Sequence, residues 1–283
     1  MRDDLRAARD AFLAKIAARP VVMGILNLTP DSFSDGGRYQ TKDAALAHAR
    51  RMVAEGCDIV DVGAESARPG AIPVSQAEEL SRLEPILEDL VHGLDAPLSI
   101  DTSKAQIAAR ATQIGAVAIN DVWGLQRDPA MAEVAAASGA AVIIVHNRIE
   151  KDPSIDILSD IRRFFDRSLG LAAKAGIVRE LLILDPGIGF AKTSRQNAEA
   201  IARIAELKDY GLPILVGLSR KSFLGSLIDR DTEATLVGTI AASLAAAAAG
   251  AAIFRVHDVA EHVAALRIFH AIRSAGGINP RTR

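Results

Sequence analysis

Short runs of apolar, mostly β-branched residues alternate with longer segments of helical periodicity along nearly the whole chain. Eight runs are expected to be strands, at 21–27, 58–63, 98–101, 117–121, 141–146, 182–185, 214–218 and 252–256. The segments between them predict amphipathic helices at 42–55, 75–92, 104–113, 129–138, 156–175, 194–208, 232–249 and 258–273. This alternation predicts βα units around a parallel sheet. Eight units favour a closed (β/α)8 TIM barrel of the α/β class, with an open doubly wound sheet as the alternative.

The chain has 283 residues and contains no linker rich in Gly, Ser or Pro. A (β/α)8 barrel of about 250 residues fits this length as one unit. We therefore expect a single domain over 1–283, with a helical extension at 1–19 and a loose tail at 276–283. Thr41 and Ser75 are the expected N-caps of two of the helices. Aromatic residues make up only 4% of the chain, so the core must be built from Ala, Val, Ile and Leu.

The net charge of −2 is too balanced for bulk binding of nucleic acid or of an anionic membrane, so neither is expected as a partner. The single cysteine, Cys57, excludes a disulfide within the chain and is expected to be buried. The first twenty residues are charged throughout and lack the apolar core of a signal peptide. The Ala-rich run 240–253 is too short to span a membrane. We expect a soluble cytoplasmic chain.

Polar residues follow directly on most of the predicted strands. In a (β/α)8 barrel the carboxyl ends of the strands lie on one rim, where the βα loops build the active site. A single Asp or Asn after a strand is more often a helix cap or a turn residue, but recurrence at seven of the eight strands favours function. The polar residues at this rim are Asn27, Asp101, Asn120, Asp121, His146, Asn147, Asp185, Ser219, Arg255 and His257.

Loops after three strands add to the rim. The segment NLTPDSFSDGGRY is long and polar and ends near two glycines, which suits a closing lid, with a disordered surface loop as the alternative. Arg220 and Lys221 open a short helix and predict an anion site, with a solvated basic turn as the alternative. Arg255 and His257 alternate along the last strand, so both can face one side and contact a phosphate.

The segment DPGIGFAK after the sixth strand carries glycines that let the backbone turn tightly and approach a ligand. It lacks the G-K-[ST] ending of a nucleotide-binding loop. The sequence also has no HExxH motif, no Cys/His cluster and no GxSxG motif. Zinc chemistry and acyl-serine chemistry are therefore unsupported.

Seven segments resemble, in the right order, the signature segments of the dihydropteroate synthase family. They run from about Val21 to His257 and read GILNLTPDSFSDGG, IVDVGAESARPGA, SIDTSK, INDVWG, LDPGIGFAKT, VGLSRKSFLG and FRVHDV. The resemblance implies a barrel that condenses 6-hydroxymethyl-7,8-dihydropterin diphosphate with para-aminobenzoate, releasing diphosphate. It also implies a magnesium ion, commonly a homodimer, and departure of the diphosphate before the amine attacks, so that no protein nucleophile is needed.

The resemblance further implies roles for particular residues. The pterin ring would be held by Asp101, Asn120, Asp185 and Lys221, and the diphosphate by Asn27, Arg68, Arg255 and His257. The amide oxygen of Asn27 would also bind Mg²⁺, because hard oxygen ligands suit this ion. Para-aminobenzoate would contact Arg68, Pro69 and Ser222. Phe33 and Asp35 would close over the reacting centre and would be catalytic together with Asn27 and Lys221.

Two positions depart from the family pattern. Ala67 stands where the family usually has a threonine, and the loss of one neutral hydrogen bond would weaken binding by about 0.5–1.5 kcal/mol. The fifth strand ends in His146, Asn147 and Arg148, where the family typically has Met-His-Met. Two alternatives stay open, a pterin-dependent methyltransferase barrel and a catalytically silent pterin-binding paralogue. The methyltransferase would not need the SRKS segment or the pair of Arg255 and His257.

Overall fold

The computed structural model describes residues 1–28, 38–65, 73–227 and 236–276. Within them, eight parallel strands form one sheet in the order β6-β5-β4-β3-β2-β1-β8-β7. A bridge between Leu184 and Ile214 links β6 to the segment that leads into β7, so the sheet closes into a barrel. The prediction of a (β/α)8 TIM barrel is confirmed. The strands are β1 Val21–Asn27, β2 Ile59–Gly63, β3 Leu98–Asp101, β4 Ala118–Asp121, β5 Ala141–Val145, β6 Leu182–Asp185, β7 Leu215–Val216 and β8 Ile253–Val256.

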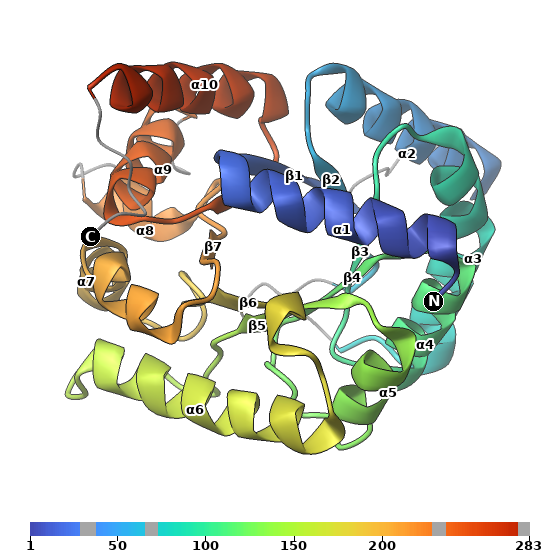
Figure 1. Cartoon of the computed structure of the whole chain (residues 1–283), viewed down its shortest axis with the longest axis horizontal. Helices are drawn as coiled ribbons and strands as arrows, with labels where there is room; N and C mark the ends of the chain where they lie inside the picture. Colours follow the sequence, from blue (N-terminus) through green and yellow to red (C-terminus); the bar gives the residue numbers. More distant parts are fainter. Residues whose placement is uncertain (29–37, 66–72, 228–235, 277–283) are drawn as a thin grey trace.

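Helices surround the strands as an outer ring (Figure 1). They are α2 Arg38–Ala54, α3 Gln76–Gly93, α4 Ala105–Ile114, α5 Met131–Ser138, α6 Ile157–Ala175, α7 Ser194–Ala202, α8 Ser222–Ser226, α9 Leu236–Ala249 and α10 Val259–Ala275. Two 3₁₀ segments, η2 Arg179–Leu181 and η3 Ile204–Tyr210, precede β6 and β7. The helix expected at 194–208 is therefore an α-helix followed by a 3₁₀ segment.

The two predicted N-caps have different outcomes. Ser75 caps α3 as expected, because its hydroxyl accepts a hydrogen bond from the backbone N–H of Glu78 at 3.2 Å. The prediction for Thr41 is wrong, because α2 begins three residues earlier, at Arg38, and Thr41 lies inside its first turn. The start predicted for the helix at 232–249 and most of the predicted tail at 276–283 fall outside the described residues.

Alternate residues of each strand face the two sides of the barrel wall. Even-numbered residues of β2, such as Val60 and Val62, pack outward in the large core between strands and helices. Ile59 belongs instead to a second core cluster inside the barrel. Asp61 and Gly63 share the alternation of Ile59, so they belong to the inner side. This alternation decides which strand-end residues reach the barrel interior.

Helix α1, Asp3–Ala18, lies across one end of the barrel (Figure 1). Its buried side chains Leu5, Phe12 and Ile16 pack in the inner cluster together with Met23 and Ile59. Burying each large side chain contributes about 1.5–3 kcal/mol. The helical extension predicted at the N-terminus therefore closes the end of the barrel at which the strands begin.

Burial and helix length test two further expectations. Cys57 is 7% exposed, so its predicted burial is confirmed, and burial raises the pKa of its thiol to about 12. Among the helices that the structure describes, none combines the length and apolar character needed to cross a membrane.

Candidate active site

The carboxyl ends of the first four strands lie in register at one rim of the barrel. Asn27 pairs with Gly63 between β1 and β2. Asp101 pairs with Gly63 on one side and with Asn120 on the other. Paired residues of a closed parallel sheet point to the same side of the barrel wall. The predicted residues Asn27, Asp101 and Asn120 therefore form one row on the inner side of the rim.

A buried ionic cluster joins this row to β8. The guanidinium of Arg255 donates from Nε to Asp61 at 2.6 Å and from Nη2 to Asp101 at 2.6 Å. The side-chain amide of Asn120 donates to Asp61 at 3.0 Å. Asp61 has no exposed surface, whereas the side chain of Arg255 is 20% exposed. Three predicted site residues thus meet around an aspartate that was not predicted.

Burial and neighbouring charges perturb the groups of this cluster. Burial raises the pKa of Asp101 to about 7, with Asp61 adding to the rise and Arg255 opposing it. Burial by itself would lower the pKa of Arg255, but Asp61 and Asp101 raise it above its usual value. Gly63 leaves room for Asp101, since a Cβ at position 63 would lie 3.2 Å from the Asp101 Cβ. Burial and the ion pair with Arg255 thus act on the pKa of Asp101 in opposite directions.

Two acceptors in this cluster have no partner among the described residues. Oδ1 of Asp61 and Oδ1 of Asn120 are buried, and neither accepts a hydrogen bond within that part of the chain. Buried polar atoms are nearly always hydrogen-bonded in folded proteins. The inner side of the rim therefore favours a ligand that presents N–H donors.

Asp185 ends β6 and is held by the glycine loop that follows it. The backbone N–H of Gly187 donates to Asp185 Oδ1 at 2.7 Å. Gly187 has a φ of +66°, and a Cβ there would lie 1.7 Å from the carbonyl oxygen of His146, so only glycine fits. Burial raises the pKa of Asp185 to about 6, while the Gly187 N–H and the charge of Lys221 oppose this rise.

Lys221 lies immediately before α8 and reaches over the same glycine loop. Its Nζ is 4.7 Å from the centre of the Phe190 ring, a cation–π contact. A Cβ at Gly189 would lie 3.0 Å from the Lys221 Cδ, so the missing side chain leaves room for the lysine. Ser222, the first residue of α8, is exposed. Asp185 and Lys221 thus face each other across one loop.

His257 and Arg220 complete the rim next to β8. Nδ1 of His257 lies 3.0 Å from Ser219 Oγ, and the backbone N–H of His257 donates to the same oxygen at 3.1 Å. The guanidinium of Arg220 pairs with Asp258 at 2.7 Å, and its place in the predicted anion site stays a prediction. Of the two adjacent cations, Lys221 is the one beside the glycine loop.

Three further strand-end residues have partners outside the cluster around Arg255. Asp121 accepts from the backbone N–H groups of Trp123 and Leu125 at 2.9 and 2.7 Å, and burial raises its pKa to about 6. Asn147 accepts from the backbone N–H of Arg148 at 2.7 Å. His146 contacts Lys192 and Asp160. Asp121 and Asn147 thus both make hydrogen bonds typical of turn residues.

The base of the second loop is fixed by a separate ionic network. Lys104 lies 2.5 Å from carboxylates of both Glu65 and Glu79. Glu79 is fully buried and also accepts from the Thr102 hydroxyl at 2.8 Å. The other oxygen of Glu65 accepts from the backbone N–H of Val74 at 3.1 Å, so Glu65 links the two ends of the loop. The network therefore fixes Glu65 and Val74, which lie on either side of this loop in the sequence.

Four predicted site residues and one departure from the family pattern lie outside the described residues. They are Phe33, Asp35, Ala67, Arg68 and Pro69. Their predicted roles stay predictions. Three described residues near the rim were missed by the sequence reasoning, namely Asp61, Phe190 and Lys192. The sequence signal available for Asp61 was an acidic residue inside an apolar strand. No sequence signal distinguished Lys192 from lysines that lie on the surface.

The magnesium ion stays a prediction, and the rim can only be compared with the ligands that the ion prefers. No group of three or more His, Cys, Asp or Glu side chains that could hold a metal ion occurs in residues 1–28, 38–65, 73–227 and 236–276. Mg²⁺ usually keeps several waters and binds through one or two protein groups plus substrate phosphates. The half-buried Asn27 at the end of β1 suits that mode, since its amide oxygen is a hard ligand.

Comparisons with known proteins agree on one family. The model of the pterin binding enzyme family matches residues 23–257. A dihydropteroate synthase of Bacillus subtilis is 42% identical over 92% of this chain and 91% of its own length. A solved dihydropteroate synthase from Clostridium difficile, crystallised in the presence of pteroic acid, is 46% identical with a TM-score of 0.87, covering 90% of this chain and 97% of its own. A Xanthomonas albilineans dihydropteroate synthase with 4-aminobenzoic acid is 41% identical with the same TM-score, covering 91% and 94%.

Proposed function

The chain belongs to the dihydropteroate synthase family of pterin-binding enzymes, and we propose that its rim joins 6-hydroxymethyl-7,8-dihydropterin diphosphate to para-aminobenzoate with release of diphosphate. The observation that carries this proposal is the set of acceptors Asp61, Asp101, Asn120 and Asp185, all buried except the partly buried Asp101, together with the cations Arg255 and Lys221. A pterin ring presents several N–H donors on one edge, and a diphosphate presents negative charge at the other end of the same molecule. The rim matches both features.

The ring is held by the acceptors on the inner side of the barrel. Asp185, whose second oxygen is engaged by Gly187, accepts from the ring's adjacent N–H groups. Asn120 and Asp101 contact the neighbouring edge, and the Lys221 ammonium donates to an acceptor of the ring. The burial of these groups excludes water, so each hydrogen bond discriminates strongly against rings that lack the matching donor.

The diphosphate lies against the cationic part of the rim. Arg255 offers a guanidinium that Asp61 and Asp101 hold in place, and His257 is oriented by Ser219. Asn27, at the adjacent strand end, would hold Mg²⁺ through its amide oxygen, and the ion would supply charge neutralisation for the diphosphate. Arg255 and His257 stabilise negative charge where it develops in the transition state.

The chemistry needs positioning more than a protein nucleophile. The bond between the exocyclic methylene carbon and the diphosphate oxygen breaks, and the oxygen keeps the electron pair. The electron-poor methylene carbon, stabilised by the pterin ring, is then attacked by the amine nitrogen of para-aminobenzoate. The new C–N bond forms and the nitrogen loses one proton to solvent. The rim's part is to hold the two substrates within reach and to keep the diphosphate charge balanced.

The second substrate is assigned to the loops. We propose that Arg68, Pro69 and the exposed Ser222 contact para-aminobenzoate, with Arg68 also reaching the diphosphate, and that Phe33 and Asp35 close over the reacting centre. The network around Lys104 supports this assignment, because it fixes the ends of the loop that carries Arg68 and Pro69. Ala67, one of the two departures from the family pattern, lies in the sequence next to Arg68 and Pro69.

Diphosphate release tests the function directly. Purified protein is given the pterin diphosphate and Mg²⁺, with and without para-aminobenzoate, and both diphosphate and dihydropteroate are measured. Dihydropteroate formed in equal amount to diphosphate is the expected result. Tight pterin binding without release under either condition would instead identify a silent pterin-binding paralogue. Turnover that needs a methyl donor and a corrinoid protein would identify a methyltransferase.

Two further features belong to the same proposal. A homodimer is favoured by exposed apolar side chains on α10, where Ile268 is 62% and Ile272 68% exposed. We also place the chain in the cytoplasm, which fractionation of the producing cells with an antibody against the chain would test.

A further inference from the structure

Lys192, on the segment between β6 and α7, is buried and is 2% exposed. Its ammonium donates to the carbonyl oxygen of Gly187 at 2.6 Å and lies 2.8 Å from Nδ1 of His146 and 3.4 Å from the carbonyl oxygen of Phe190. These three acceptors match the three N–H donors of a lysine. No carboxylate within the described residues forms an ion pair with Lys192, so its donors are used on the backbone of the glycine loop and on one histidine.

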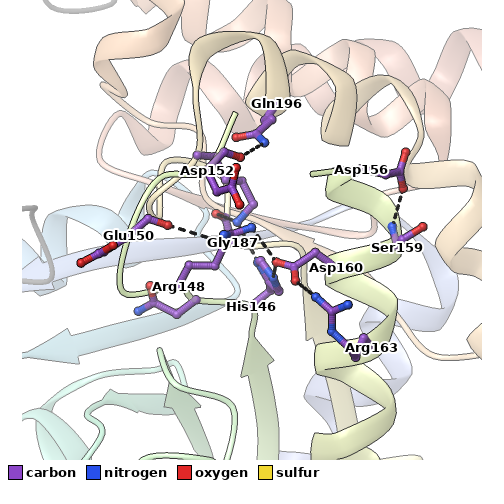
Figure 2. A network of polar contacts seen from close by, with 12 residues as sticks. His146, Arg148, Glu150, Asp152, Asp156, Ser159, Asp160, Arg163, Gly187 and Gln196 are labelled. Atoms are coloured by element: carbon purple, nitrogen blue, oxygen red, sulfur yellow. Dashed lines mark hydrogen bonds and ion pairs between the residues drawn. The ribbon is translucent and has the colours of Figure 1, made fainter. Parts of the chain in front are cut away.

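His146 faces outward from the end of β5 and continues this chain of contacts. Its Nε2 lies 3.2 Å from Oδ2 of Asp160 on α6, and Arg148 contacts the same oxygen at 3.0 Å. Figure 2 shows Asp160 between His146 and Arg163, which donates to the other carboxylate oxygen. Hydrogen bonding to His146 lowers the pKa of Asp160, while burial and the charge of Lys192 lower the pKa of His146 to about 4. His146 is therefore neutral.

Burial lowers the pKa of Lys192 to about 7, and the charges of Asp185 and Asp160 oppose this fall. With His146 neutral and Lys192 protonated, one proton arrangement satisfies every member of the network. The Lys192 ammonium donates to Nδ1 of His146, so Nδ1 carries no proton and Nε2–H donates to the Asp160 carboxylate. The reverse tautomer would place an unprotonated Nε2 against a carboxylate. Asp160, held by two arginines, thus fixes the histidine tautomer, and the histidine presents a fixed acceptor to Lys192.

The same network holds the loop on which the proposed pterin contacts depend. Gly187 accepts from Lys192 through its carbonyl and donates to Asp185 through its N–H. The ring of Phe190 lies under the ammonium of Lys221, and the carbonyl of Phe190 faces Lys192. Lys192 therefore holds both parts of the loop. It fixes the backbone that orients Asp185 and the residue whose ring contacts Lys221.

We propose that Lys192 is a positioning residue for pterin binding, acting through the Gly187–Phe190 segment, with His146 and Asp160 holding its ammonium in place. This inference rests on the proposed function of the rim. It explains why His146 follows a strand end and yet lies outside the substrate site. It also assigns a role to the buried lysine of the GFAK segment.

The test compares two affinities in each variant. Calorimetry gives the dissociation constant of 6-hydroxymethylpterin, the ring without the diphosphate, and separately that of inorganic diphosphate with Mg²⁺. Lys192→Met keeps the length of the side chain but removes its donors. We expect its pterin affinity to fall tenfold or more while its diphosphate affinity stays within twofold of the wild type. Lys174→Met, an exposed lysine on α6, is the matched control and should change neither.

A pair of changes at His146 covers the case in which Lys192→Met does not fold. His146→Gln keeps an acceptor for Lys192, whereas His146→Leu is apolar and leaves one donor of Lys192 unsatisfied. Positioning by Lys192 predicts that pterin affinity follows the order wild type, Gln, Leu, with a loss of threefold or less for Gln and tenfold for Leu. A role in packing alone predicts that Leu is tolerated at least as well as Gln.

The outcomes separate the inference from the proposed function. If the wild-type chain neither binds 6-hydroxymethylpterin nor forms dihydropteroate, the proposed function fails. If the wild type does both and Lys192→Met keeps its pterin affinity within twofold, the inference alone fails. A parallel loss of pterin and diphosphate affinity would also overturn it, because general loosening of the barrel affects both ends of the site.

Discussion

Three aspartates around the rim sit where burial raises their pKa, Asp101 to about 7 and Asp121 and Asp185 to about 6. A carboxylate kept charged against this tendency costs folding free energy at neutral pH. Asp121 recovers part of that cost through two backbone N–H groups. Asp101 and Asp185 place carboxylates on the inner side of the barrel. There, hydrogen bonds from a ligand with N–H donors offset the free energy that their burial costs.

Asp185→Asn should therefore stabilise the free protein at high pH. The folded pKa of Asp185 is about 6 against an ordinary 3.8, so between these values the folded chain holds a proton that the unfolded chain has lost. The wild type thus loses stability as pH rises through this window, and asparagine removes the loss while keeping an acceptor for Gly187. Urea unfolding should show a gain of about 1–3 kcal/mol at pH 8 that disappears near pH 4.

The same variant should bind pterin about ten- to hundredfold more weakly, since a charge-assisted hydrogen bond is worth about 1.5–3 kcal/mol. Asp95→Asn, at an exposed position, is the control for both measurements. A wild type more stable than Asp185→Asn at pH 8 would mean that Lys221 and Gly187 more than compensate the buried charge.

Asp61→Asn should have the opposite effect on stability. Asp61 is fully buried and accepts from both Arg255 and Asn120, so its loss leaves the guanidinium with Asp101 alone. Removing one partner of a buried ion pair costs roughly 3–5 kcal/mol. Urea unfolding at pH 7 measures this loss, with Asp43→Asn on the exposed side of α2 as the control. Unchanged stability would show that Asp101 balances Arg255 unaided.

At the scale of the elements, the alternation along each strand separates site residues from structural ones. Ile183 of β6 faces inward, so Asp185, two residues later, also faces inward. Val145 of β5 faces inward, so His146, the next residue, faces outward. Likewise Asn120 has the alternation of Ala118 on the inner side, and Asp121 does not. The strand positions followed from local sequence and were predicted closely. The partners of His146 and Asp121 were not predicted. Lys192 is 46 positions from His146 in the sequence, and the Trp123 and Leu125 N–H groups reach Asp121 only because the chain turns there.

The second loop gives a prediction at this scale. Lys104→Met leaves the fully buried Glu79 with the Thr102 hydroxyl alone and releases Glu65 from the base of the loop. Stability should fall by roughly 3–5 kcal/mol, as for other broken buried pairs. Because residues 66–72 carry the proposed aminobenzoate contacts, KM for para-aminobenzoate should rise more than KM for the pterin substrate. Steady-state kinetics measure both, with the exposed Lys151→Met as the control, and an equal rise in both would contradict a role specific to this loop.

At the scale of the whole molecule, stability and chemistry occupy opposite ends of the barrel. Helix α1 fills the end where the strands begin, with Phe12 and Ile16 fully buried, while polar and charged residues fill the other end. This division is common in (β/α)8 barrels, where loops at the carboxyl ends vary in function on a scaffold closed elsewhere. Apolar burial at the closed end also offsets the free energy that the buried carboxylates cost at the rim.

The outer surface carries the last prediction. Ile268 and Ile272 lie one turn apart on α10 and are 62% and 68% exposed, so they form an apolar stripe that a monomer would leave in water. If this stripe is the dimer interface, Ile268→Glu combined with Ile272→Glu should give a monomer that melts cooperatively. Light scattering after size exclusion measures the mass, and Val178→Glu, 57% exposed beside η2, should stay dimeric. A wild type that is monomeric at micromolar concentration, or a double variant that remains a dimer, would move the interface elsewhere or remove it.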